Sequence, residues 1–379
     1  MKKVLATVLA LVMALALCSV SWATESELPT EENGVIKLTG NVTLTARWEV
    51  AADKEITLDL NGYSITSAGQ VIMNNGKLTI TDNKGGGKIV STGSQAIGVG
   101  SNSVTNIQKA IVESVEGAVI TGYATGATIN IYDGTFSASD NAVIAGNGKS
   151  REGTGNTINI SGGVFNGKIT TPGYVACGIY APWKDNINVT GGTFNITGGA
   201  GIVARAGNVT VTNAVFNTTG NATGKVGDSR VVVPCSAIVF DSQANYPAMN
   251  NDSVIHVVSG KFNSEMNAVS MIKNDNETDR VAVTGGTFST DVKEYLAEGK
   301  ILQKNGDTYT AVTNSGITSG TYTAKPTVPD GYKVVENTDG TFTVEKVGGY
   351  YYYQPTTDTK ADDTKGSPKT FDAGIALYV

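Results

Sequence analysis

The chain has 379 residues, of which 40% are hydrophobic and 16% are charged, and its formal net charge is −6. The apolar fraction is enough for a folded core, while the acidic balance excludes a protein that neutralises the phosphates of nucleic acid. The single histidine, His256, excludes chemistry that needs two histidines. The 46 glycines have no third-residue period, so a collagen triple helix is excluded as well.

Residues 1–23 have the pattern of a secretory signal peptide. Two lysines follow Met1, residues 4–17 are apolar apart from Thr7, and Ser21 and Ala23 are the small residues that precede a cleavage site. The apolar run is shorter than a membrane span requires. The pattern predicts an exported protein, with residues 24–34 as a short lead-in to the folded part.

Residues 35–290 repeat one short pattern, in which an apolar–polar–apolar strand is followed by small residues and then by Phe or Ile. The clearest copies are residues 129–136, 158–165, 187–194, 209–216, 255–262 and 281–288. Earlier copies begin at Leu58, Leu78 and Val104. A second motif, a small residue followed by Ile or Val, lies between consecutive copies, as at Ala142 and Val143.

The repeat predicts the fold. Alternation with a period of two indicates strands, and a unit of 20–29 residues is too small to bury its own apolar face, so the units must stack. The sequence therefore predicts an all-β, single-stranded parallel β-helix (β-solenoid) of nine or ten rungs over residues 35–290, with rungs about 4.8 Å apart. The recurring aromatic residues are then expected to form one internal stack: Phe136, Phe165, Phe194, Phe216, Phe262 and Phe288.

The repeated units resemble those of secreted pectate-lyase-like and adhesin proteins of bacteria, which are right-handed parallel β-helices. The resemblance covers residues 35–290 and is one of pattern. It implies a location outside the bacterial cell, either secreted or on the cell wall and cell surface, and it implies fold more than activity.

Residues 291–349 are expected to close the open end of the solenoid. Residues 291–298 fit one helical turn, and residues 299–312 and 331–345 each have a polar turn between two strand-like runs. This spacing predicts two β-hairpins. A hairpin over the last rung would protect an edge that is otherwise unpaired.

Residues 350–379 become polar and are expected to form a disordered linker. Within them, residues 367–372 resemble a sortase sorting signal of the S-P-K-T-G kind. The resemblance implies cleavage after Thr370 and attachment by a sortase to peptidoglycan. The alternative is that these residues are a plain disordered tail.

The outward positions of the strands contain little that could catalyse a reaction. The register predicts one outward column made of Asp59, Thr79, Thr105, Asn130, Asn159, Asn188, Thr210, His256 and Ala282. This column holds one carboxylate and neither Arg nor Lys, whereas β-helix enzymes that act on acidic polysaccharides use stacked carboxylates with a basic residue. The sequence leaves enzyme activity uncertain and favours a non-enzymatic protein.

The loops that leave the short strand are expected to lie along one edge of the rod. They contain the candidate ligand-binding residues Trp183, Lys184, Asp185, Arg205, Asp241 and Tyr246. Exposed aromatic rings beside charged groups suit the recognition of sugars or proteins. The alternative is that the loops are tolerated insertions and that Trp183 packs against the rod.

The sequence predicts neither a metal site nor a disulfide. Asp275, Glu277 and Asp279 have the oxygen ligands that Ca²⁺ prefers, but their spacing matches no calcium-binding loop, so we expect no cofactor. Cys177 and Cys235 are expected two rungs apart, about 9.6 Å, which exceeds the reach of a disulfide. We expect two free, buried thiols.

These patterns favour a monomeric surface protein that binds a glycan or a host or cell-surface glycoprotein through the loop edge, and not nucleic acid. One alternative is a polysaccharide lyase or glycoside hydrolase with an atypical site, in which Asp241 with Lys184 or Arg205 would supply the acid and the base. Another is a structural protein of the cell envelope that serves as a spacer.

Overall fold

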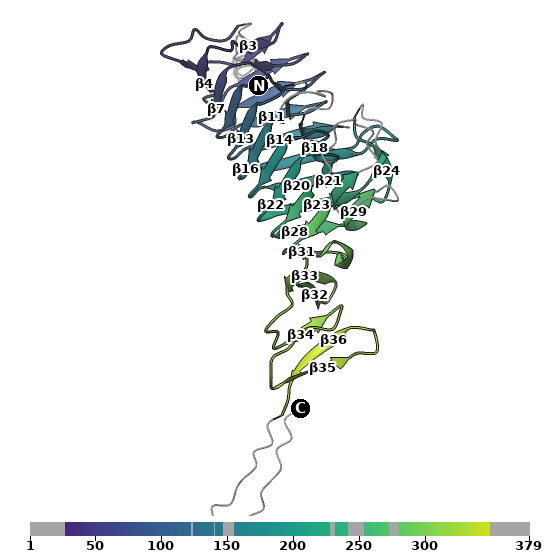
Figure 1. Cartoon of the computed structure of the whole chain (residues 1–379). Helices are drawn as coiled ribbons and strands as arrows, with labels where there is room; N and C mark the ends of the chain where they lie inside the picture. Colours follow the sequence, from purple (N-terminus) through teal and green to yellow (C-terminus); the bar gives the residue numbers. More distant parts are fainter. Residues whose placement is uncertain are drawn as a thin grey trace, which may run out of the picture.

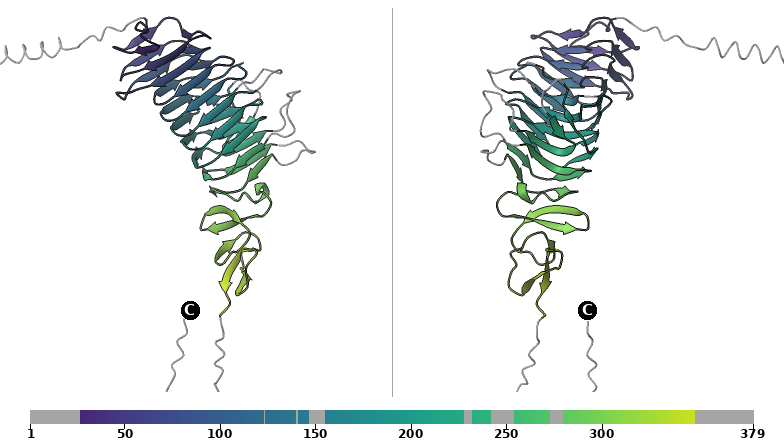
Figure 2. Two further views of the ribbon diagram at one scale, coloured as in Figure 1. Left: turned by 60° about the vertical axis from the view of Figure 1, so that its left-hand side comes forward. Right: turned by 90° about the vertical axis from the view of Figure 1, so that its right-hand side faces the viewer.

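The structure, a computed structural model, describes residues 27–122, 124–139, 141–146, 155–227, 232–241, 254–272 and 280–348. These residues form a three-sided parallel β-solenoid of about nine turns, followed by a smaller antiparallel β region (Figure 1). Each turn of the chain passes once through each of three sheets, as Figure 2 shows from two further sides. The prediction of a parallel β-solenoid is therefore confirmed.

Sheet 1 contains the apolar–polar–apolar strands of the repeat, and all its neighbouring strands pair in parallel. It consists of β1 (Val35–Lys37), β4 (Glu55–Asp59), β7 (Lys77–Thr81), β10 (Val104–Ile107), β13 (Thr128–Ile131), β16 (Thr157–Ile160), β19 (Asn186–Val189), β22 (Asn208–Val211), β27 (Val254–Val257) and β30 (Val281–Val283). Alternate residues of these strands are buried, as a period of two requires.

Sheet 2 follows the small residues of the repeat and contains the phenylalanines. Its parallel strands are β2 (Val42–Leu44), β5 (Ser64–Ser67), β8 (Lys88–Ser91), β11 (Ile111–Ser114), β14 (Thr135–Ser139), β17 (Val164–Lys168), β20 (Thr193–Thr197), β23 (Ala214–Thr219), β28 (Gly260–Ser264) and β31 (Thr287–Phe288). The six predicted phenylalanines stack inside the solenoid with ring centroids 4.4–5.5 Å apart. The internal stack is confirmed.

Sheet 3 contains the second motif of the repeat. Its strands are β3 (Trp48–Val50), β6 (Ile72–Asn74), β9 (Ile97–Val99), β12 (Val119–Ile120), β15 (Ala142–Ala145), β18 (Ala176–Ala181), β21 (Gly199–Ala204), β26 (Ser236–Asp241) and β29 (Asn267–Ile272). Small residues are needed here because a Cβ atom on Gly178 would lie 2.5 Å from the carbonyl oxygen of Gly201 and 3.0 Å from the ring of Phe194.

Two of the earliest copies have a different register from the one that the repeat predicts. Thr57, not Asp59, pairs with Thr79, because β4 is two residues out of the predicted phase. In β10, Asn106 pairs with Thr79, while Thr105 faces inward and is fully buried. Thr105 is tolerated inside because its hydroxyl accepts a hydrogen bond from Nδ2 of Asn74 over 2.8 Å.

The turn from sheet 1 to sheet 2 explains the small residues that precede each phenylalanine. Gly163 and Gly192 have φ angles of +98° and +94°, which L side chains rarely adopt. In the earlier turns, where an Asp follows the strand, Asp82 accepts hydrogen bonds from three backbone N–H groups, those of Gly62, Gly85 and Gly87. Asp59 is buried in the neighbouring turn in the same way.

A second, smaller apolar cluster covers the outer face of sheet 3 in the middle of the rod. Its centre is the antiparallel pair β24 (Thr223–Lys225) and β25 (Val232–Pro234). Val226 and Val233 pack there with Val203 and Val239 of sheet 3 and with both cysteines. Cys177 and Cys235 are free and buried, and they lie two turns apart with β21 between them, as predicted.

The solenoid ends in the region that follows residue 290. A 3₁₀ helix, η1 (Lys293–Tyr295), stands where one helical turn is predicted. Two antiparallel hairpins are present, β32 (Lys300–Asn305) with β33 (Thr308–Thr313) and β35 (Tyr332–Glu336) with β36 (Phe342–Lys346). Strand β34 (Gly320–Tyr322) joins them, and β33 pairs with β31, so that sheet 2 continues into this region.

Several predictions fall on residues that the structure does not describe. These are the signal peptide, the acidic turn of Asp275, Glu277 and Asp279, the linker of residues 350–379 and the sorting motif with Thr370. Among the described residues, no helix has the length and the apolar character that a membrane span needs.

Candidate functional site

Of the candidate residues on the predicted loop edge, Trp183, Asp185, Arg205 and Asp241 are buried in the structure. The described turns lie on one another: the N–H of Asn186 donates to the carbonyl oxygen of Asn156, and that of Asn208 donates to Asp185. Trp183 is 1% exposed. The predicted exposure of this ring is therefore wrong, and the alternative, that Trp183 packs against the rod, is what the structure shows.

The physical reason is a tight turn between β18 and β19. The N–H of Asp185 donates to the carbonyl oxygen of Trp183 over 2.8 Å, so the turn folds back on itself. Asp185 is fully buried, and its Oδ1 accepts hydrogen bonds from the N–H and Nδ2 of Asn156 at 2.8 and 3.0 Å. Asp185 thus connects two neighbouring turns of the solenoid. Lys184 is exposed, with Nζ 5.9 Å from the centre of the Trp183 ring.

The structure does bring Arg205 and Asp241 together. Nε of Arg205 lies 3.2 Å from Oδ2 of Asp241, and a guanidinium nitrogen donates to the hydroxyl of Tyr180 over 3.3 Å. Both charged side chains are buried, 11% and 5% exposed. A guanidinium keeps its proton in proteins, so this pair has no group that can act as a base beside Asp241. Its geometry suits a link between turns of the rod. Tyr246 lies outside the described residues.

Asparagine side chains form two ladders on the outer faces of the solenoid. On sheet 1, Asn130, Asn159 and Asn188 each donate Nδ2 to the Oδ1 of the asparagine one turn earlier, over 2.8–2.9 Å. On sheet 2 a second ladder joins Asn166, Asn195, Asn217 and Asn263. These amides satisfy one another, so the ladders stabilise the faces. His256 is an exposed member of the sheet 1 column.

A shallow groove lies on the outer face of sheet 3 in the first turns of the rod. It is a hollow of about 460 Å³ that crosses β6, β9 and β12 and reaches Arg47, the residue before β3. Its base is made by Met73, Gly98 and Ile120, which occupy one outward column. Gly98 matters because a Cβ atom there would collide with the side-chain amide of Gln70. The base is therefore flat and largely apolar.

Polar side chains line both sides of this groove. Arg47, Gln70 and Gln95 come from the turns that enter sheet 3, and Asn75, Ser101 and Thr121 come from the turns that leave it. A guanidinium nitrogen of Arg47 donates to Oε1 of Gln70 over 3.2 Å. On the opposite side, Nδ2 of Asn75 donates to Oε1 of Glu49 over 2.6 Å, which fixes the orientation of that amide.

The groove has the chemistry of a binding site. Amides and hydroxyls can both donate and accept hydrogen bonds, which matches the hydroxyl groups of sugars, and a flat apolar base can contact the face of a sugar ring. Arg47 is the one charged residue among those that line it. Among the described residues, no cluster of His, Cys, Asp and Glu could hold a metal ion.

Sequence reasoning missed the groove because it looked for long loops. The groove residues lie in short turns of the early copies, two of which have a different register from the predicted one. A usable signal was present: long polar side chains recur just before the short apolar strand at Arg47, Gln70 and Gln95. Later copies have Asn141 or Gly199 at the start of this strand and do not form such a row.

Comparisons of the chain with protein-family models, with curated proteins and with solved structures find no match.

Proposed function

We propose that the protein is a non-enzymatic rod, exported to the bacterial surface, that binds a glycan or a cell-surface glycoprotein in the groove over the first turns of sheet 3. The observation that carries the proposal is the groove itself, which places amide and hydroxyl groups on both sides of an apolar base. The buried loop-edge residues do not offer such a surface. The signal-peptide pattern of residues 1–23 supports export.

The solenoid supports this function by holding the groove rigid. The groove residues come from successive turns that are fixed by parallel pairing, so little conformational entropy is lost when a ligand binds. The rest of the rod, followed by the sheet 2 extension, would hold the groove away from the envelope. The sorting-signal resemblance at residues 367–372 supports attachment at the opposite end of the chain.

The enzyme alternatives need groups that the groove lacks among its described residues. Glycoside hydrolysis uses two carboxylates on either side of the scissile bond, whereas the groove has only the carboxylate of Glu49 beside it, which is held by Arg47 and Asn75. A lyase needs a base that can lose its proton, whereas Arg47 stays protonated. For these reasons we place binding, not cleavage, in the groove.

The test is an array of glycans and glycoproteins probed with the full chain and read for both bound protein and new sugar ends. We expect saturable binding without cleavage. Release of reducing or unsaturated sugar ends would contradict the proposal and favour an enzyme. No binding to any glycan or glycoprotein would also contradict it and would leave the structural spacer as the better account.

A matched pair of variants locates the binding. Gln95→Ala removes an amide from the groove, while Gln108→Ala removes one from an exposed turn between sheets 1 and 2. We expect Gln95→Ala to weaken binding by about tenfold, as loss of one or two hydrogen bonds predicts. Gln108→Ala should bind as the unchanged protein does. Equal effects of the two variants would place the site elsewhere.

A further inference from the structure

Within the described part of the chain, the last strand of sheet 3 has no further strand beside it, unlike the last strands of the other two sheets. Sheet 2 continues through β31 into β33, and in sheet 1 the carbonyl oxygen of Val283 accepts the N–H of Ala297 over 2.9 Å. Strand β29 is at the end of its sheet. At the start of the strand, the N–H of Ala268 donates to Oγ1 of Thr290 over 2.8 Å.

The register shows which backbone groups face this edge. Earlier in sheet 3, the N–H of Ile97 donates to the next turn over 2.9 Å, and that of Gly146 does so over 2.8 Å. Val269 and Met271 occupy the same two columns. Their N–H and C=O groups therefore point away from β26, and within the described part of the chain they have no hydrogen-bond partner on that side.

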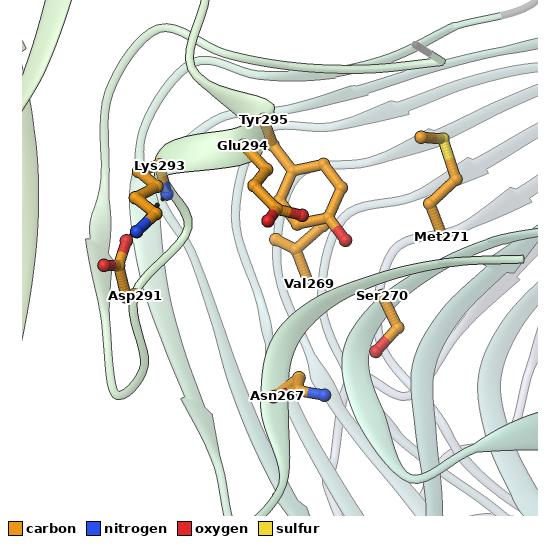
Figure 3. Close-up of a pocket in the computed structure, with 8 residues that line it drawn as sticks. All are labelled: Asn267, Val269, Ser270, Met271, Asp291, Lys293, Glu294 and Tyr295. Carbon is orange, nitrogen blue, oxygen red and sulfur yellow. Dashed lines mark hydrogen bonds between the residues drawn. The ribbon is translucent and has the colours of Figure 1, made fainter.

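A hollow of about 440 Å³ lies against this edge, between β29 and η1. Figure 3 shows Glu294 and Tyr295 of η1 on the side of the hollow that faces Val269 and Ser270. The hollow therefore has a strand edge on one side and an acidic side chain and an aromatic ring on the other.

The charges around the hollow favour a basic ligand. Asp291 and Glu294 contribute two carboxylates against the single ammonium group of Lys293. Oδ1 of Asp291 already accepts the backbone N–H of Lys293 over 2.8 Å, whereas the exposed Glu294 has no ion pair among the described residues. Glu294 is thus the group that a cation in the hollow would meet.

We propose that this edge binds an extended, basic peptide segment of a partner protein, which adds one strand to sheet 3. The peptide would exchange backbone hydrogen bonds with Val269 and Met271 and place a Lys or Arg side chain beside Glu294. The surroundings favour a single strand over a second copy of the solenoid. η1 and the β32–β33 hairpin lie beyond the last turn, on the side from which another solenoid would have to approach (Figure 1).

The test uses hydrogen exchange, measured by NMR on the full chain, with the acetylated and amidated peptide Thr-Val-Lys-Val-Thr-Val as the probe. In the free protein we expect the amide protons of Val269 and Met271 to exchange faster than those of Ile202 and Ala204 in the interior of sheet 3, because only the latter are hydrogen-bonded to the next turn. The peptide at about 1 mM should slow the two edge amides by tenfold or more.

Two N-methylated forms of the peptide provide a matched control. In an extended peptide, alternate backbone N–H groups point to opposite sides. N-methylation of one alternate set removes the N–H groups that face β29, while N-methylation of the other set leaves those groups intact. We expect one phase to lose binding by about tenfold or more and the other to bind normally. Equal binding by both forms, or none by the parent peptide, would overturn the proposal.

Two variants of the protein separate backbone pairing from charge. Met271→Pro removes a backbone N–H group that faces the hollow and leaves the N–H groups that are hydrogen-bonded to β26 in place. The strand should therefore persist while peptide binding is lost. Glu294→Gln should weaken binding of the lysine peptide but not of a peptide in which Thr replaces the Lys. Glu298→Gln should change the binding of neither peptide.

The amide protons of Val269 and Met271 must exchange quickly in the free chain. If they are already protected, and the protection does not depend on concentration, another segment of the chain occupies the edge. If the protection depends on concentration, a second copy occupies it. Either result would contradict the proposal.

Discussion

At the scale of single residues, burial decides which side chains are structural. Trp183 has the largest of the fully buried side chains, within a turn that the Asp185 hydrogen bonds hold closed. Trp183→Ala should lower the free energy of unfolding by about 3–5 kcal/mol, because it removes a large buried group. Chemical denaturation checks this value. Lys184→Ala, one residue on and exposed, is the control and should change it by less than about 0.5 kcal/mol.

Acid should weaken the turn that contains Asp59. Burial raises the pKa of this carboxyl. Hydrogen bonds from the side chain and backbone of Asn83 and from the N–H of Asn61, together with the charge of Lys37, lower the pKa by more than burial raises it, so the net shift is downward. The folded pKa lies below the unfolded one. The resulting stability is therefore complete above the unfolded pKa and is lost as the pH falls through the folded pKa.

The variant Asp59→Asn tests this linkage. We expect it to be less stable than the unchanged protein at pH 7, and the difference should shrink as the pH falls toward the folded pKa, where the wild-type carboxyl takes up a proton. Urea denaturation at a series of pH values measures it. A difference that does not depend on pH would show that the Asp59 hydrogen bonds do not require the charge.

At the scale of elements, the turn between sheets 1 and 2 depends on glycine for two reasons. Gly192 has a positive φ, and a Cβ atom there would also lie 3.2 Å from the carbonyl oxygen of Gly163 in the turn below. Gly173 has a similar φ of +85° but open space around it. Comparing the two separates the backbone preference from crowding.

We therefore expect Gly192→Ala to destabilise the protein more than Gly173→Ala does. The second variant should cost about 1–2 kcal/mol, which is the penalty for a left-handed L residue. The first should add the cost of moving a neighbouring turn. Thermal and chemical unfolding of the two variants measure both values, and equal losses would show that the stacked turns can relax around a methyl group.

At this scale, the positions of the phenylalanines could be predicted from the sequence, but the phase of β10 could not. The position of each phenylalanine in sheet 2 follows from the period of the repeat, since an aromatic ring every turn packs well only on the ring below. The phase of β10 did not follow, because Val104 looks like an inward residue while the buried Thr105 is made tolerable by Asn74, 31 positions away. A partner so distant in the chain cannot be found from local alternation.

At the scale of the whole molecule, architecture was predictable and the candidate site was not. Any unit that must stack to bury its apolar face yields a solenoid, so the fold follows from the repeat. The groove needs the side chains of four successive turns to align, and that alignment depends on registers that the early copies obscure. The loop edge was predicted from the position of its loops and from their aromatic and charged residues, which do not show whether Trp183 or Arg205 turns toward the rod.

The central claim is that recognition takes place in the groove of sheet 3 and not at the loop edge. The most direct test is to titrate a ligand identified on the array against two variants, Met73→Trp, which fills the base of the groove, and Trp183→Ala. We predict that Met73→Trp weakens binding by about tenfold or more with little change in stability, because Met73 faces outward. Trp183→Ala should lower stability yet keep its affinity at a temperature where it is folded. The reverse pattern, binding lost in Trp183→Ala and kept in Met73→Trp, would contradict the claim and return the site to the loop edge.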